Sequence, residues 1–411
     1  MSNESASKVY RPLVINTAFW FIDLNHMTIK QQILDYASSR AEYDENFAFS
    51  ASDFDDRRKF QQAMMDFLRA REYAELEHRC RELYALILSL HDKYSILNPT
   101  IEKSLIDELY GTSNYQAHRL HFVHQANVFL LGLYIYHNLR LLRKEMESEM
   151  ERTTTMIDGG PYGPFRYSGG SKYGEFLYRW RLSSLCHDIG TAVQSCAGKK
   201  TCIAKTLTQI PLLKNADSIE DLCSFQGHDF LRELEDACPT VRFSKYLKYH
   251  ESNPCPQGVR HDHGIVGALI FLRHMRQAFW DHRDNRISHV GGKAVFWHPQ
   301  ILSSSIVQIA LSIAVHNLDT HPEAFQKFAD AEGVFNLQNH PLAWLLKIAD
   351  LLQEWEKPKL REQQTREDPG INMKITFSDS KIIVDNFPEA RREKALITIT
   401  KYTWPRDLIS I

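Results

Sequence analysis

The side chains of this sequence that could do chemistry together are histidines and aspartates set in apolar segments. The chain has 19 histidines, and imidazole is the commonest metal ligand in proteins. His187 and Asp188 follow the apolar stretch WRLSSLC and precede Ile-Gly, which allows the chain to bend. A histidine beside an aspartate in a buried helical setting is costly unless something coordinates them. This pair is therefore the first candidate for a metal-binding and catalytic site.

The His-Asp dipeptide alone is weak evidence, because it also occurs at 91–92, 228–229 and 261–262. A lysine follows the pair at 91–92 and a glycine-containing polar segment surrounds the pair at 228–229, so we expect both at the surface. Hydrogen bonds could satisfy one buried polar residue in an apolar helix, but this explanation is poor for five such segments. The other four segments contribute His124, His263, His316 and Asp350.

The order His … His-Asp … His … His … Asp, each on its own predicted helix, resembles the HD superfamily of metal-dependent phosphohydrolases. The matching segments lie within residues 120–355 and resemble uncharacterised bacterial members more than any named enzyme. They are HFVHQANVFL, CHDIG, HDHGIVGAL, AVHN and IADLLQEW.

The resemblance implies a site for two divalent transition-metal ions. One ion would be bound by His124, His187, Asp188 and Asp350. Asp188 would bridge to a second ion, bound also by His263 and His316. Imidazole and carboxylate together suit Fe, Mn, Zn, Co or Ni better than Ca or Mg, and a bridging carboxylate can hold two ions that share a hydroxide.

The activity that the resemblance implies is hydrolysis of a small phosphorylated substrate, a nucleotide or a cyclic nucleotide, with His187 and Asp188 at the catalytic centre. Two alternatives stay open. HD-fold di-iron oxygenases of the inositol oxygenase type use the same ligand order, and an HD scaffold can also serve as a non-catalytic ligand-sensing module.

The sequence departs from the resemblance where many relatives carry a lysine, three residues after the HD aspartate. Thr191 stands there, so a contact to substrate phosphate must come from elsewhere. Asn317 follows a predicted ligand and either supports it or faces the substrate. We predict substrate binding by Asn317, Arg260 and Lys172; the other basic candidates are Arg179, Arg181, Lys199 and Lys200.

The elements that must position these residues are predicted to be helices, because helix formers and apolar spacing dominate. We expect a mainly α-helical HD-domain bundle with a small C-terminal β appendage. Glycine, proline and serine in residues 153–174 predict a loop that serves as a lid, with helix resuming at about Glu175. MKITFSD, KIIVDNF and ALITITKY alternate like strands. The predicted helical segments are 58–93, 102–110, 117–150, 262–280, 300–317, 322–331 and 340–356.

These patterns predict an N-terminal helical extension packed on the core (1–100), followed by the HD metal-binding domain (101–370). This domain carries insertions at 151–175 and 196–260, and the β appendage covers 371–411.

Composition is that of a soluble globular protein, with 43% hydrophobic and 24% charged residues. The formal charge of −2 and the lack of a basic cluster with aromatics do not indicate nucleic acid as a partner. The N-terminus lacks the apolar region of a secretory signal, and no apolar run reaches the roughly 20 residues of a membrane span. The seven cysteines form no CxxC pair. We therefore expect a cytoplasmic protein without a membrane partner, and a homo-oligomer is compatible with the sequence.

Overall fold

The structure is a computed structural model, and it describes most of the chain in separate ranges. These are residues 28–40, 54–70, 73–89, 116–155, 171–194, 203–204, 207, 216–253, 262–281, 287–290, 293–296, 299–353, 373–378, 381–402, 405 and 407–411.

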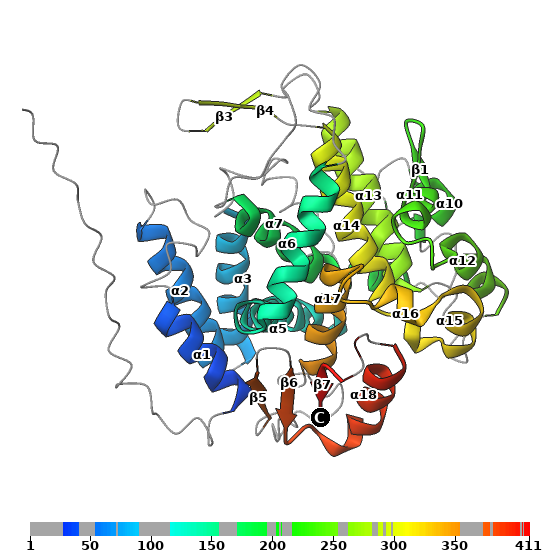
Figure 1. Cartoon of the computed structure of the whole chain (residues 1–411). Coiled ribbons are helices and arrows are strands. Elements are labelled where there is room, and N and C mark those ends of the chain that lie inside the picture. Colours follow the sequence, from blue (N-terminus) through cyan, green and yellow to red (C-terminus); the bar gives the residue numbers. More distant parts are fainter. Residues whose placement is uncertain are drawn as a thin grey trace, which may run out of the picture.

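Three helices with nearly continuous apolar sequence form the centre of the molecule. They are α13 (His263–Asp281), α14 (Pro299–Val315) and α17 (Pro341–Leu352). A helix that is apolar all round has to be buried on every side, and residues 264–272, 309–316 and 341–349 of these segments are buried throughout. Helix α14 packs against both α13 and α17, so it lies between them (Figure 1).

Two further helices complete the core around α14 and α17. Helix α5 (Gln116–Asn138) packs on α7 (Ser171–Cys186) and α17. A Cβ atom at Gly132 would lie 1.9 Å from the ring of Trp180, so only glycine allows α5 to approach α7 this closely. The indole Nε1 of Trp180 donates to Phe129 O at 3.0 Å, which fixes the ring against α5. Helix α6 (Arg140–Thr155) follows α5 directly and packs on α5, α7 and α17.

The helical segment predicted at 58–93 is two helices, α2 (Phe54–Arg69) and α3 (Tyr73–Ser89), that pack on each other. Helix α1 (Ile29–Arg40) packs on α2, and α3 packs on α5. Figure 1 shows these N-terminal helices on one side of the bundle. The predicted helix 102–110 lies outside the described residues.

The remaining elements are short; α10, α11, α12 and α15 lie on the side opposite the N-terminal helices, and the hairpin β3–β4 does not (Figure 1). Helices α11 and α12 pack against each other, and α12 packs on α15. Each of the hairpins β1–β2 and β3–β4 is antiparallel. The bounds of these elements are α8 (Thr191–Gln194), α10 (Ile219–Leu222), β1 (Ser224–Phe225), β2 (His228–Asp229), α11 (Phe230–Ala237), α12 (Phe243–Ser252), β3 (Ile287–Val290), β4 (Lys293–Phe296), the 3-10 helix η6 (Leu318–Thr320), α15 (Pro322–Phe328) and α16 (Ala331–Val334).

The C-terminal appendage is a small sheet with a helix. Strand β5 (Lys374–Phe377) pairs antiparallel with β6 (Ile382–Asp385), which pairs in parallel with β7 (Ile409–Ser410). The sheet joins the N-terminal helices because the Gln32 side chain exchanges hydrogen bonds with the backbone of Ile375, at 2.9 and 3.0 Å.

One predicted strand in this appendage is wrong, because ALITITKY belongs to helix α18 (Glu389–Tyr402). The helix formers EARREK precede this stretch and continue into it. Ala395 and Ile399 are buried, and their four-residue spacing is helical. The threonines are also satisfied in the helix, since Thr398 Oγ1 donates to Asp319 Oδ2 and Thr400 Oγ1 donates to Leu396 O.

The predicted loop 153–174 is too long at both ends. Helix α6 continues to Thr155 and α7 begins at Ser171, not at about Glu175. Tertiary contacts hold this first turn of α7, since the Tyr173 ring lies against Tyr136 and its hydroxyl contacts His137 Nε2 at 2.8 Å. Residues 156–170, the centre of the predicted lid, lie outside the described residues.

The predicted fold class is confirmed: the protein is mainly α-helical with a small β appendage. Helices of the described ranges are all too short or too polar to cross a bilayer.

Candidate metal centre

The six predicted metal ligands lie on five different segments, and all but His124 lie at or next to a helix end. His187 and Asp188 follow the last residue of α7 directly, and His263 is the first residue of α13. His316 follows the last residue of α14. His124 lies in the first half of α5 and Asp350 in the last turn of α17. The packing of these helices thus brings residues together that are up to 226 positions apart in sequence, from 124 to 350.

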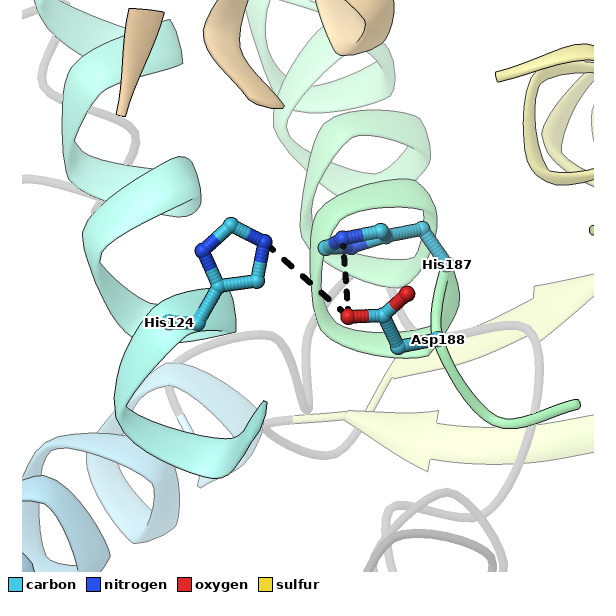
Figure 2. Close-up of side chains that lie close together, drawn as sticks. All are labelled: His124, His187 and Asp188. Atoms are coloured by element: carbon cyan, nitrogen blue, oxygen red, sulfur yellow. Dashed lines mark ion pairs between the residues drawn. The ribbon is translucent and has the colours of Figure 1, made fainter. Parts of the chain in front are cut away.

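Asp188 is at the centre of the cluster. Its Oδ2 atom lies 3.3 Å from His187 Nε2 and 3.9 Å from His124 Nε2. Figure 2 shows these three side chains, with both imidazoles turned toward the carboxylate. The other oxygen, Oδ1, lies 3.5 Å from His263 Nε2 and 3.8 Å from His316 Nε2. Each oxygen of one carboxylate therefore faces a different pair of imidazoles.

Asp350 joins the first of these pairs. Its Oδ1 atom lies 2.9 Å from His124 Nε2 and 4.0 Å from His187 Nε2. The donor atoms form two groups that can each hold a metal ion and that share Asp188: His124, His187 and Asp188 in one, and Asp188, His263 and His316 in the other. The structure thus brings all six predicted ligands together.

The histidine ring nitrogens that face away from the carboxylates have hydrogen-bond partners. Nδ1 of His187 lies 2.8 Å from Ser184 O, and Nδ1 of His316 lies 2.6 Å from Ile313 O. Nδ1 of His124 lies 2.5 Å from the side-chain oxygen of Gln353. A carbonyl oxygen can only accept, so each Nδ1 carries the proton and each Nε2 presents a lone pair. Metal-binding histidines are oriented by outer hydrogen bonds of this kind.

His187 shows the chemistry of a metal ligand most clearly. It is fully buried, and its Nε2 atom makes no hydrogen bond within the described part of the chain. Burial lowers the pKa of His187 to about 4, against a smaller opposing effect of Asp188. The ring is therefore neutral at physiological pH, and an unsatisfied buried nitrogen lone pair fits a bound metal ion.

His316 shows the electrostatic effect of the two carboxylates. Burial works to lower the pKa of His316, but the contact with Asp188 and the charge of Asp350 outweigh it, and the pKa is raised. The two carboxylates thus attract positive charge into this site. Lys347 is a buried cation close by, whose Nζ donates to His316 O at 2.9 Å and to Asp319 Oδ1 at 2.5 Å.

The turn that carries His187 and Asp188 is held by close packing. Thr191 donates its hydroxyl to Asp188 O at 2.7 Å. A Cβ atom at Gly190 would lie 2.0 Å from His263 O. Gly190 therefore does more than let the chain bend, because only glycine allows α13 to bring His263 this close to Asp188.

The predicted substrate-binding residues lie in different places. Asn317 is beside the cluster, with Nδ2 3.2 Å from His263 Nδ1 and 3.4 Å from Asp262 Oδ2, so it contacts a predicted ligand. Lys172 lies in the first turn of α7, at the opposite end of this helix from His187, and pairs with Glu151. Arg260 lies outside the described residues. A role of these residues in substrate binding stays a prediction.

Two basic candidates for phosphate binding are wrong, because Arg179 and Arg181 are buried in the helical core. Arg179 bonds to Glu149 at 2.8 Å and to Glu175 at 2.7 Å. Arg181 donates to Ile87 O at 3.3 Å. Lys199 and Lys200 lie outside the described residues.

The histidine of the dipeptide at 228–229 is partly exposed and its aspartate is exposed, as expected. The dipeptide at 91–92 lies outside the described residues. The dipeptide at 261–262 contains Asp262, whose place in a second cluster of metal-ligand residues the sequence did not predict. Asp262 is fully buried and, with His250 and His321, forms a further group of metal-ligand type. The only signal in the sequence was an aspartate placed directly before a strongly apolar helix.

No protein-family model, curated protein or solved structure matched the chain. The class that the fold and the site define is a mainly α-helical protein with buried His/Asp clusters that can hold metal ions.

Proposed function

We propose that the protein is a metal-dependent phosphohydrolase of the HD type, which hydrolyses a phosphoester of a nucleotide or cyclic nucleotide with two divalent transition metals. The observation that carries the proposal is the position of the Asp188 carboxylate: its two oxygens face two different imidazole pairs. A carboxylate in this position can bridge two ions, the arrangement used for in-line displacement at phosphorus.

The residues present fit such ions. His124, His187, Asp188 and Asp350 would bind one, and Asp188, His263 and His316 the other. Metals of this type lower the pKa of bound water and neutralise charge on phosphoryl oxygens. Nitrogen and carboxylate ligands favour Fe, Mn, Co, Ni or Zn.

The chain itself supplies orientation and an entrance. The side chains of His187 and His316 are 1% and 2% exposed, whereas that of Asp350 is 28% and that of His263 15% exposed. A substrate would therefore approach from the side of Asp350 and His263. In the proposed reaction, a water oxygen bonds to phosphorus, the bond to the leaving oxygen breaks, and a proton from water ends on the leaving group.

The test begins with elemental analysis of protein purified without chelators. Apoprotein reloaded with Mn²⁺, Fe²⁺, Co²⁺ or Zn²⁺ is then screened against phosphomonoesters, phosphodiesters, nucleotides and cyclic nucleotides. We expect metal-dependent release of phosphate or of a mononucleotide, lost in His187→Ala and retained in His228→Ala, the matched histidine of the surface dipeptide.

Other results would overturn the proposal. Aerobically purified protein with two irons and oxygen consumption would favour the di-iron oxygenase. Protein that retains no metal and hydrolyses none of the esters would favour the non-catalytic ligand-sensing module.

A further inference from the structure

A second set of metal-ligand residues lies beside the candidate centre and shares no residue with it. Three elements contribute to it: His250 near the end of α12, Asp262 directly before α13, and His321 between η6 and α15. One donor atom from each lies within 4.8 Å of the other two. We refer to these three residues as the lateral cluster.

The two oxygens of Asp262 differ in their hydrogen bonds: one caps a helix, and the other accepts only a long hydrogen bond. Oδ1 accepts a hydrogen bond from Ile265 N at 3.0 Å, which caps the N-terminus of α13. Oδ2 accepts one long hydrogen bond, from Asn317 Nδ2 at 3.4 Å, and lies 4.0 Å from His321 Nε2. The second distance is too long for a hydrogen bond. The cap therefore explains the position of Asp262 but not the surroundings of Oδ2.

The burial of Asp262 calls for a positive charge near Oδ2. Its side chain is 0% exposed, and an ionised carboxylate in such a place is costly unless it is paired or binds a metal. His321 Nε2 lies 4.0 Å from Oδ2, too far for a hydrogen bond that would bring a charge to it. A metal ion bound by both residues would supply the charge.

The two imidazoles are placed to share a ligand with Asp262. The rings of His250 and His321 lie 4.1 Å apart, centroid to centroid, at an angle of 70°. His250 is buried, whereas the His321 side chain is 21% exposed, so the cluster has an entrance on the side of His321. Two histidines and one carboxylate with a solvent-facing side form a donor set typical of divalent transition metals.

We propose that His250, Asp262 and His321 bind a further divalent transition-metal ion, separate from those of the candidate centre. This proposal does not depend on phosphohydrolase activity, because it concerns metal binding by three residues outside the Asp188 cluster.

Asn317 connects the lateral cluster to the candidate centre. If His263 binds a metal through Nε2, its proton is on Nδ1. Nδ1 then donates a hydrogen bond, so the Asn317 amide must turn its oxygen toward this ring to accept it. Because the same amide atom also faces Asp262 Oδ2, this orientation places two oxygens against each other, and they repel. A cation at the lateral cluster offsets this repulsion, so we expect metal binding at the two sites to be mutually favourable.

The experiment is metal titration of the full chain with Co²⁺ and, separately, Zn²⁺, read by equilibrium dialysis with elemental analysis and by the visible spectrum of bound Co²⁺. We expect His321→Ala to bind one equivalent less than wild type and to lose part of the Co²⁺ absorption. Asp262→Asn should lose the same equivalent, although asparagine keeps the cap on α13. His228→Ala, a histidine that also has a carboxylate neighbour, should bind as wild type does.

The deciding quantity is the difference in metal content between wild type and His321→Ala at saturating metal, where coupling between the sites changes their affinities but not their number. Equal metal content and equal Co²⁺ spectra in wild type, His321→Ala and Asp262→Asn would overturn the proposal and leave the lateral cluster a packing arrangement. Circular dichroism of each variant identifies loss of folding. His321→Ala, at a partly exposed position, and the cap-preserving Asp262→Asn keep the test decisive if one of them fails to fold.

Discussion

The dipeptides His187-Asp188 and His228-Asp229 have the same two residues in the same order and opposite surroundings. His187 is fully buried and Asp188 faces four imidazoles. The His228 side chain is 42% exposed and bonds to Glu233 at 2.6 Å, while Asp229 caps α11 by accepting from Arg232 N at 3.1 Å. Identical chemistry in sequence thus becomes a candidate metal centre in one place and a helix cap in the other, because the neighbouring helices differ.

The largest expected difference between the two dipeptides concerns their aspartates. Asp188→Ala removes the carboxylate shared by both ligand groups, so we expect metal binding at the candidate centre to weaken by more than the roughly 10–100-fold that loss of an outer-shell partner causes. Equilibrium dialysis with elemental analysis measures it, with Asp229→Ala as the matched control. Near-full metal content in Asp188→Ala would show that this residue is not a bridging ligand.

The second prediction concerns stability and the buried histidine His340. Burial lowers the pKa of His340 to about 4, as it does for His187. His340 belongs to none of the metal-ligand groups formed by the described residues. Between pH 6.5 and 4 the unfolded chain binds this proton and the folded chain does not. Acidification should therefore lower the free energy of unfolding by about 1.4 kcal/mol per pH unit, roughly 3 kcal/mol in total.

Chemical denaturation of wild type and His340→Gln from pH 7 to pH 4 checks this effect. The wild-type stability should fall more steeply than that of the variant, and Zn²⁺ should not change the difference. Parallel pH curves would mean that His340 binds its proton over the same pH range in the folded and the unfolded chain.

Substitution of the hydrogen-bond partners of His124 and His228 should also have different effects on metal binding. Gln353 orients His124 through Nδ1, so we expect Gln353→Ala to weaken metal binding about 10–100-fold. Glu233 is the corresponding partner of His228, and Glu233→Ala should leave metal affinity unchanged. Isothermal titration with Zn²⁺ compares the two variants; equal affinities would argue against an orienting role of Gln353.

The smallest effect belongs to the exposed dipeptide. Asp229→Ala removes the cap of α11 and should lower the free energy of unfolding by about 1 kcal/mol. Urea denaturation detects this change, and unchanged stability would indicate that water replaces the cap. Metal content should stay that of wild type, which makes the variant a useful control for Asp188→Ala.

The sequence by itself determined the helical class and the six residues that meet at the candidate centre. Both depend on local signals, because long apolar helices must be buried and a histidine or aspartate within them needs a partner. Nearness in sequence to His187 misled at Arg179 and Arg181, because each has a partner on another helix, Glu149 and Ile87, that holds it in the core. Alternation of apolar and polar residues misled in ALITITKY, where burial of Ala395 and Ile399 selects helix over strand.

Only the tertiary structure decided which ligands face each oxygen of Asp188 and which further cluster lies beside the candidate centre. Three features each depend on how the helices pack: the two faces of Asp188, the close approach at Gly190, and the cluster of His250, Asp262 and His321. The packing joins residues that are far apart in sequence, such as Asp188 and His316, which are separated by 128 positions. Such contacts leave no periodic mark on the sequence, because the spacing between helices is set by loops and packing. A residue type indicates which chemistry is available, and the fold determines which atoms can perform it together.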